Sequence, residues 1–170
     1  MRRKNLFPIV VFCALFSFVG VSAGAETAAP KAAESTSLLE RTSTTLQDLV
    51  LKGLEFVGVN YRWGGTNPDV GLDCSGFVQL VFQDSIGLLL PRTAREMSAV
   101  GEKVDRAQLQ PGDLVFFNTM RHAFSHVGIY LGDDKFVHAP RAGGEVRVED
   151  MRGSYWARRF DGARRVADIR

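Results

Sequence analysis

The feature that most constrains this chain is the segment over residues 61–77, YRWGGTNPDVGLDCSGF, in which a turn-rich loop ends at Cys74. Gly, Asn and Pro before the cysteine are typical of turns. The apolar run over residues 77–82, FVQLVF, is typical of a buried segment. We therefore expect a helix that begins near Cys74 or Ser75, ends near residues 84–85 and is broken by Gly87. This places the thiol at the N-terminus of a helix.

Helical patterns dominate the first half of the chain beyond residue 45. Apolar residues at spacings of three and four predict a first helix over residues 45–57; they are Leu46, Leu49, Val50, Leu54 and Val57. Thr93 is a helix-capping residue type and predicts a short helix that ends near Val100.

Strand patterns dominate the second half. Continuous apolar runs over residues 114–117 and 127–131 predict central strands, and a turn at residues 132–134 leads into a returning strand over 135–139. Residues 145–149 alternate charged and apolar side chains, residues 154–159 predict a helical turn, and residues 160–166 predict a last edge strand. Helices followed by strands indicate an α+β domain over residues 46–170, with the helices packed on an antiparallel sheet.

The N-terminus has the layout of a secretory signal peptide. A cationic start over residues 1–5 precedes a run of 16 uncharged residues, 6–21, whose last residue, Val21, opens the small-residue segment Val-Ser-Ala-Gly-Ala. We expect a signal peptide over residues 1–25, cleaved after Ala23 or Ala25. An uncleaved anchor is the alternative, but the run is shorter than the roughly 20 residues that span a bilayer. A lipid anchor at Cys13 is disfavoured because bulky residues precede it. Residues 26–45 are poor in large apolar side chains and predict a flexible lead.

Removal of the signal peptide changes both the charge and the cysteine content. The net charge falls from +2 to −1, because 18 basic residues remain against 19 acidic ones, so nothing favours nucleic-acid binding. Cys74 becomes the single cysteine. An unpaired thiol in an exported protein indicates that its reactivity is used, although a buried, inert thiol is the alternative.

Two histidines are candidate partners for Cys74. His126 and His138 lie at equal distances from Gly132, so a hairpin centred there places the two rings close together. A base and a residue that orients it would suit a thiol nucleophile, whose pKa the helix N-terminus and a protonated His126 would lower. The alternatives are structural histidines, or a zinc site with Cys74 as third ligand. His122 lies in a polar loop and is expected to be exposed, with substrate contact as the alternative.

Six blocks in order carry a family resemblance; they are residues 61–65, 72–78, 90–92, 110–117, 126–132 and 136–139. Together they resemble the NlpC-type cell-wall cysteine peptidases, which have a papain-like fold. The resemblance implies that Cys74 is the nucleophile, His126 the base and His138 the orienting residue.

The resemblance also implies roles around the nucleophile. Tyr61 would line the site and assist the oxyanion beside the Cys74 amide, and Asp73 and Ser75 would flank the substrate peptide. Arg92 would contact the substrate or hold its loop. A helix N-cap is the alternative for Asp73, and a structural salt bridge is the alternative for Arg92. The chain departs from the family near Met97, where many relatives carry a glutamine.

The implied function is that of an exported thiol endopeptidase that cuts peptidoglycan stem peptides or cross-links next to diaminopimelate. The absence of wall-binding repeats from the sequence favours cross-link cleavage in a periplasm, and an extracellular, wall-associated location is the alternative. We expect peptidoglycan as the partner, a monomer, no cofactor or metal, and no stable membrane span after signal cleavage. The alternatives are an amidase or acyltransferase on the same scaffold, and a catalytically silent wall-binding protein.

Overall fold

The computed structural model of the chain describes residues 44 and 46–166. The predicted signal peptide lies outside these residues, as does the predicted flexible lead as far as residue 43. Within the described residues, no helix has both the length and the apolar composition needed to cross a membrane.

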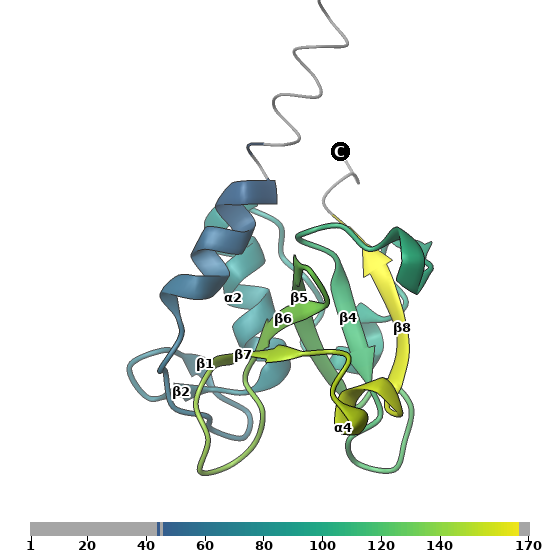
Figure 1. The fold of residues 1–170 in the computed structure, drawn as a ribbon. Helices are drawn as coiled ribbons and strands as arrows, with labels where there is room; N and C mark the ends of the chain where they lie inside the picture. The colour runs from purple at the N-terminus through teal and green to yellow at the C-terminus, as the bar shows by residue number, and fades with distance from the viewer. Residues whose placement is uncertain (1–43, 45, 167–170) are drawn as a thin grey trace, which may run out of the picture.

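Two helices lie side by side against one face of a sheet (Figure 1). The first covers residues 46–55 and the second is α2 (Cys74–Ile86). The first helix buries Leu49 and Gly53, and Phe56 just beyond its end is partly buried. Leu54 and Val57 of the predicted apolar face are 38% and 49% exposed. Gly53 allows the close approach, because a Cβ there would lie 3.3 Å from Val137 Cγ1 of the sheet. The prediction of a helix here is confirmed, but its buried face was wrong in part.

Caps fix the ends of α2. The Asp73 carboxylate accepts a hydrogen bond from the Gly76 amide at 2.7 Å, and Gly87 ends the helix with a φ of 68°. The helix therefore begins at Cys74, as the sequence predicts. Thr93 and Glu96 form a capping box on α3 (Ala94–Met97), which ends three residues before the predicted boundary at Val100.

Six strands form an antiparallel sheet in the order β3-β8-β4-β5-β6-β7. In that order they are Glu102–Val104, Phe160–Arg165, Leu114–Phe117, His126–Gly132, Lys135–His138 and Arg147–Asp150. The prediction of an edge strand at residues 160–166 was wrong, because β8 pairs with both β3 and β4. The missing neighbour, β3, is only three residues long and carries two exposed charged residues, so it gives no strand pattern.

Shorter elements complete the chain. A two-stranded hairpin, β1 (Thr66–Asn67) and β2 (Gly71–Leu72), lies in the loop before Cys74. A 3₁₀ turn, η1 (Arg106–Gln108), precedes β4, and α4 (Ser154–Ala157) precedes β8.

Both faces of the sheet are covered, which explains the continuous apolar strands. On one face Phe116, Ile129 and Val137 join the core formed with α2. On the other face Phe117 and Phe136 pack against Trp156 of α4. Because side chains alternate along a strand, His126 and His138 point to the α4 side.

The β5–β6 hairpin differs in register from the predicted one. Its turn consists of Asp133 and Asp134, both with positive φ, and a bulge lies between Tyr130 and Gly132. Ile129 is the partner of Val137, so His138 lies across from Gly128 rather than from His126. A shift of two residues keeps both histidines on the same face, whereas a shift of one would have separated them.

Candidate active site

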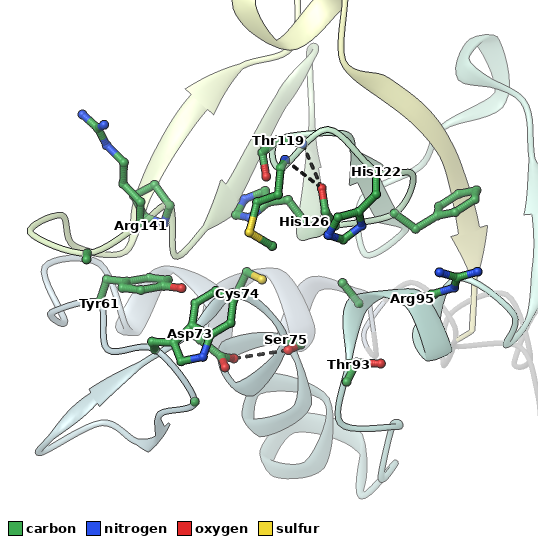
Figure 2. A pocket seen from close by; sticks show the side chains of 18 of the residues that line it. Tyr61, Asp73, Cys74, Ser75, Thr93, Arg95, Thr119, His122, His126 and Arg141 are labelled. Atoms are coloured by element: carbon green, nitrogen blue, oxygen red, sulfur yellow. Dashed lines mark hydrogen bonds between the residues drawn. The ribbon is translucent and has the colours of Figure 1, made fainter.

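A cleft of about 1150 Å³ opens between the N-terminus of α2 and the end of the sheet at which β5 begins. Figure 2 shows the Cys74 sulfur pointing into this cleft from below, with His126 on the opposite side. Of the residues predicted for the site, the lining includes Tyr61, Asp73, Cys74, Ser75, Arg92 and His126. His138 lies behind His126 and is fully buried. The structure thus brings together segments that are more than 60 residues apart along the chain.

Cys74 lies among backbone amides at the start of α2. The amides of Val127, Ser75 and Cys74 itself donate toward the sulfur and favour its ionised form. Burial and the neighbouring Asp73 carboxylate outweigh them and raise the pKa of Cys74 to about 11. The predicted position at a helix N-terminus is confirmed, but the prediction of a lowered pKa was wrong.

His126 and His138 form a buried pair. Nε2 of His126 lies 2.7 Å from Nδ1 of His138, and the two rings are nearly perpendicular at 89°. Burial and the neighbouring imidazole lower the pKa of His126 well below its usual value, and burial also lowers the pKa of His138. Near neutral pH the free protein therefore holds a neutral thiol and neutral imidazoles, not the protonated His126 that the sequence suggested. His138 contacts Nε2 of His126, so Nδ1 is the His126 ring nitrogen that does not contact His138.

Glu149 of β7 continues the row of side chains formed by His126 and His138, and it was not predicted from the sequence. Its Oε1 lies 3.7 Å from Nε2 of His138, and its carboxylate accepts hydrogen bonds from Arg147 and from the indole of Trp156. The pKa of Glu149 is lowered to about 2. The neighbouring His138 is the largest cause, and the hydrogen bonds from Trp156 and Arg147 lower the pKa further. The available signal was the charge alternation over residues 145–149, which puts Glu149 on the same face of β7 as Arg147.

Trp156 encloses the histidine pair from the α4 side. Its ring stacks on His126 with centroids 5.7 Å apart, and it meets His138 edge-on at 4.9 Å. Nothing in the spacing of the sequence links residue 156 to residues 126 and 138, since the contact depends on how α4 folds back over the sheet. This aromatic cover excludes water from the pair and explains the lowered pKa values.

Asp73, Ser75 and Arg92 form one hydrogen-bonded cluster at the base of the cleft. Arg92 donates to both oxygens of Asp73, at 3.0 and 2.6 Å, and to Ser75 Oγ at 2.8 Å. Asp73 is also the N-cap of α2. Both structural alternatives are therefore present in the fold, although all three residues also line the cleft.

Tyr61 forms the wall beside Cys74. Its backbone amide donates to the Gly144 carbonyl at 2.8 Å, which ties this wall to the loop between β6 and β7. Burial, followed by Cys74 and Asp73, raises the pKa of Tyr61 to about 12. Its phenol therefore stays protonated at neutral pH and is a hydrogen-bond donor facing the cleft.

The rim of the cleft carries exposed and positively charged side chains. His122 lies on the rim and is exposed, as predicted. Arg95 and Arg141 also line the cleft, and neither pairs with a carboxylate among the described residues. Over residues 44 and 46–166, no group of three or more His, Cys, Asp and Glu side chains is arranged to hold a metal ion.

Known proteins share this sequence and fold. The chain is 42% identical over 118 residues to the murein DD-endopeptidase MepH of Escherichia coli strain K12, covering 68% of this chain and 44% of that protein. It is 42% identical over 122 residues to the gamma-DL-glutamyl hydrolase of Bacillus subtilis strain 168, covering 71% of this chain and 29% of that protein. The chain thus spans less than half the length of either relative.

A solved structure and a family-wide comparison agree with these matches. The crystal structure of an NlpC/P60 family protein from Bacillus cereus ATCC 10987 superimposes with a TM-score of 0.67 at 35% identity, covering 72% of this chain and 40% of that one. This likeness confirms the predicted α+β, papain-like fold. The sequence model of the NlpC/P60 family matches residues 58–165, which include Cys74, both buried histidines and the whole cleft, and the chain therefore belongs to the NlpC/P60 family.

Proposed function

We propose that this protein is a cysteine endopeptidase that hydrolyses amide bonds in peptidoglycan stem peptides or their cross-links. The observation that carries the proposal is the arrangement of Cys74, His126 and His138 at one cleft. A thiol at the end of α2 faces a buried imidazole, and a second imidazole holds that ring at 2.7 Å. Family membership supports the same reading.

Cys74 would attack as its proton leaves. In the free protein both groups are neutral, so His126 Nδ1 takes the proton from the thiol while Sγ bonds to the carbonyl carbon of the scissile amide. The developing oxyanion is met by the Cys74 amide and the Tyr61 hydroxyl. One such donor contributes on the order of 10²–10³ in rate.

His126 carries the proton in both halves of the reaction, the formation and the hydrolysis of the acyl-enzyme. The imidazolium returns its proton to the leaving amine, the C–N bond breaks, and an acyl-enzyme remains on Sγ. Water then attacks the thioester, giving its proton to His126, and the protonated imidazole returns it to the departing thiol. His138 holds the His126 ring in place throughout. Asp73, Ser75 and Arg92 form the floor on which the substrate peptide lies.

The two curated relatives support the substrate class. One is named for DD-bonds in murein and the other for bonds to γ-glutamyl residues. Both bond types fit the proposed cleavage next to diaminopimelate, either within a cross-link or after D-glutamate. The unpaired Arg95 and Arg141 suit a substrate that carries free carboxylates.

The proposed setting is the cell envelope. We propose that residues 1–25 direct export and are removed after Ala23 or Ala25, leaving a monomer that acts in the periplasm or outside the cell on the wall itself. The mass of the mature protein recovered from an envelope fraction tests this. A mass that retains residues 1–25 would contradict cleavage.

Digestion of muropeptides tests the activity. Purified wild-type protein is incubated with monomeric and cross-linked muropeptides beside Cys74→Ala, and the products are identified by mass. We expect cleavage by the wild type alone, and the product masses name the bond. Identical product patterns from both proteins would contradict the proposal and favour a silent wall-binding role. Transfer of the acyl group to an added amine, with little hydrolysis, would favour an acyltransferase.

A further inference from the structure

At the buried end of the histidine pair, one ring nitrogen lacks a hydrogen-bond partner among the described residues. His138 is fully buried, its Nδ1 faces His126, and its Nε2 has no hydrogen-bond partner within normal distance among the described residues. An unpaired buried ring nitrogen costs free energy and leaves the tautomer of the ring undefined. The Glu149 carboxylate, 3.7 Å away, faces this nitrogen.

Glu149 is held in place by contacts that only a carboxylate can accept in full. Arg147 Nε donates to its Oε1 at 2.5 Å, and Trp156 Nε1 donates to its Oε2. Its neighbour across the ladder is Phe136, which puts Glu149 one diagonal position from His138 on the same face of the sheet. Two fixed donors therefore keep a negative charge at the closed end of the row.

We propose that Glu149 is a positioning residue that fixes the tautomers of His138 and His126, and so makes His126 Nδ1 the base that faces Cys74. This inference rests on the proposed function, since it assigns a further residue to the same reaction. The carboxylate keeps a proton on Nε2 of His138, so His138 Nδ1 is left as an acceptor. That acceptor keeps a proton on Nε2 of His126, so His126 Nδ1 carries the free electron pair.

The negative charge of Glu149 also affects the state in which His126 is protonated. When His126 takes the thiol proton, a positive charge forms in a buried site where it is poorly solvated. The negative charge two rings away stabilises it. The charged and titratable groups that face the row are Cys74 from α2, His126 from β5, and Arg147 from β7 itself. Arg147 opposes Glu149 by lowering the pKa of His138. From α4, the uncharged Trp156 packs on the histidine pair, and the titratable Tyr155 packs edge-on against Trp156 and lines the cleft.

Glu149→Gln, with Glu149→Asp and the exposed Glu145→Gln as comparisons, tests the proposal. The glutamine keeps an acceptor for Trp156 but loses the charge. We expect kcat to fall about 10- to 100-fold with little change in KM, because the base is mispositioned and its protonated form is destabilised. Without the carboxylate the pKa of His126 falls, so the acid limb of kcat/KM moves to lower pH. Glu149→Asp should recover part of kcat, and Glu145→Gln should match the wild type.

A purely structural role would behave differently. It would lower the active fraction and the unfolding midpoint without moving the acid limb, and an unmoved limb with wild-type kcat per active site overturns the inference. Nitrogen-15 NMR of the histidine rings in the wild type gives a readout that does not depend on the variants folding. We expect the Nε2–H tautomer at both His126 and His138, and an Nδ1–H tautomer at His138 overturns the inference.

A parallel assay of Cys74→Ala separates this inference from the proposed function. If Cys74→Ala retains wild-type activity, the proposed function fails. If Cys74→Ala is inactive while Glu149→Gln is indistinguishable from the wild type, only the role of Glu149 fails.

Discussion

Gly128 and His138 approach each other so closely that a Cβ on the glycine would lie 3.1 Å from the Cβ of the histidine. The same Cβ would lie 2.8 Å from both the Phe136 ring and the Val137 carbonyl oxygen. The glycine therefore leaves the space into which His138 leans to reach His126, which is not its direct partner in the ladder. The shifted register places His138 across from Gly128, and this pairing leaves no room for a side chain at Gly128.

Gly128→Ala should consequently impair activity and stability together. The added methyl group meets backbone and ring atoms that cannot move independently, so we expect a loss of about 1–3 kcal/mol in the free energy of unfolding, with displacement of His138. Urea unfolding and muropeptide hydrolysis measure the two effects. Gly153→Ala is the control, because its Cβ would meet only the Asp150 carbonyl, at 3.2 Å. Normal activity in a folded Gly128→Ala protein would contradict this account.

Local signals in the sequence predicted much of the fold. The start of a helix at Cys74, the break at Gly87 and the apolar runs at 114–117 and 127–131 are set by near neighbours in the chain, and the structure confirms them as one helix and two strands. The failures involve distant contacts. The place of β8 inside the sheet depends on pairing with β3, a strand of three residues some 60 positions away. The buried stripe of the first helix depends on Gly53, which has no side chain to register in a hydrophobic pattern.

The candidate site was likewise predicted in part, and the residues that were missed depend on distant contacts. The motif around Cys74 and the near symmetry of a hairpin predicted a site at Cys74, His126 and His138, and an error of two residues in register left both rings on one face. Glu149 and Trp156 were missed because their positions depend on the return of the chain through β7 and α4. The pKa of Cys74 was misjudged because the helix N-terminus is visible in sequence, whereas the burial that outweighs it is not.

His138→Gln should retain more activity than His138→Ala. A glutamine can accept a hydrogen bond from His126 through its carbonyl oxygen and donate to Glu149 through its amide group. Alanine does neither, and leaves a cavity beside Trp156. The two variants are compared by kcat at equal fractions of folded protein. The reverse order of activity would count against an orienting role for His138.

The alkylation of Cys74 should report a neutral thiol at rest. Because burial raises the pKa of Cys74 to about 11, the rate of reaction with iodoacetamide should climb through the neutral and alkaline range without an early plateau. The rate is followed by mass spectrometry across the pH range, with free cysteine as the reference. A plateau that begins at acidic pH would reveal a resting ion pair between Cys74 and His126, contrary to the structure.

Stability should decline as the pH falls below about 6.5. The pKa values of His126 and His138 are lowered in the folded protein, so the unfolded chain binds more protons in this range. Each such proton contributes a slope of up to about 1.4 kcal/mol per pH unit, and the stabilisation is complete above the unfolded pKa. Urea unfolding between pH 7.5 and pH 5 measures the slope, above the range in which carboxylates begin to titrate.

Replacement of the two histidines provides the control for this pH dependence. His126→Gln combined with His138→Gln should flatten the slope, whereas His122→Gln, at an exposed ring, should leave it unchanged. A wild-type stability that stays constant over the same interval would show that the pair does not resist protonation.

The cleft charge should affect substrate binding more than the chemical step. Asp73 is paired with Arg92, and Glu149 with Arg147, so Arg95 and Arg141 are cations of the lining without a carboxylate partner among the described residues. For a stem peptide with free carboxylates, Arg95→Gln or Arg141→Gln should each raise KM about two- to five-fold, in keeping with an exposed ion pair. Because salt screens such contacts, higher ionic strength should raise KM more for the wild type than for the double variant.

Arg158→Gln, at an exposed arginine outside the cleft, is the matched control. If the double variant keeps the wild-type KM and salt dependence, the substrate carboxylates bind elsewhere, and the cationic rim has no part in selecting them.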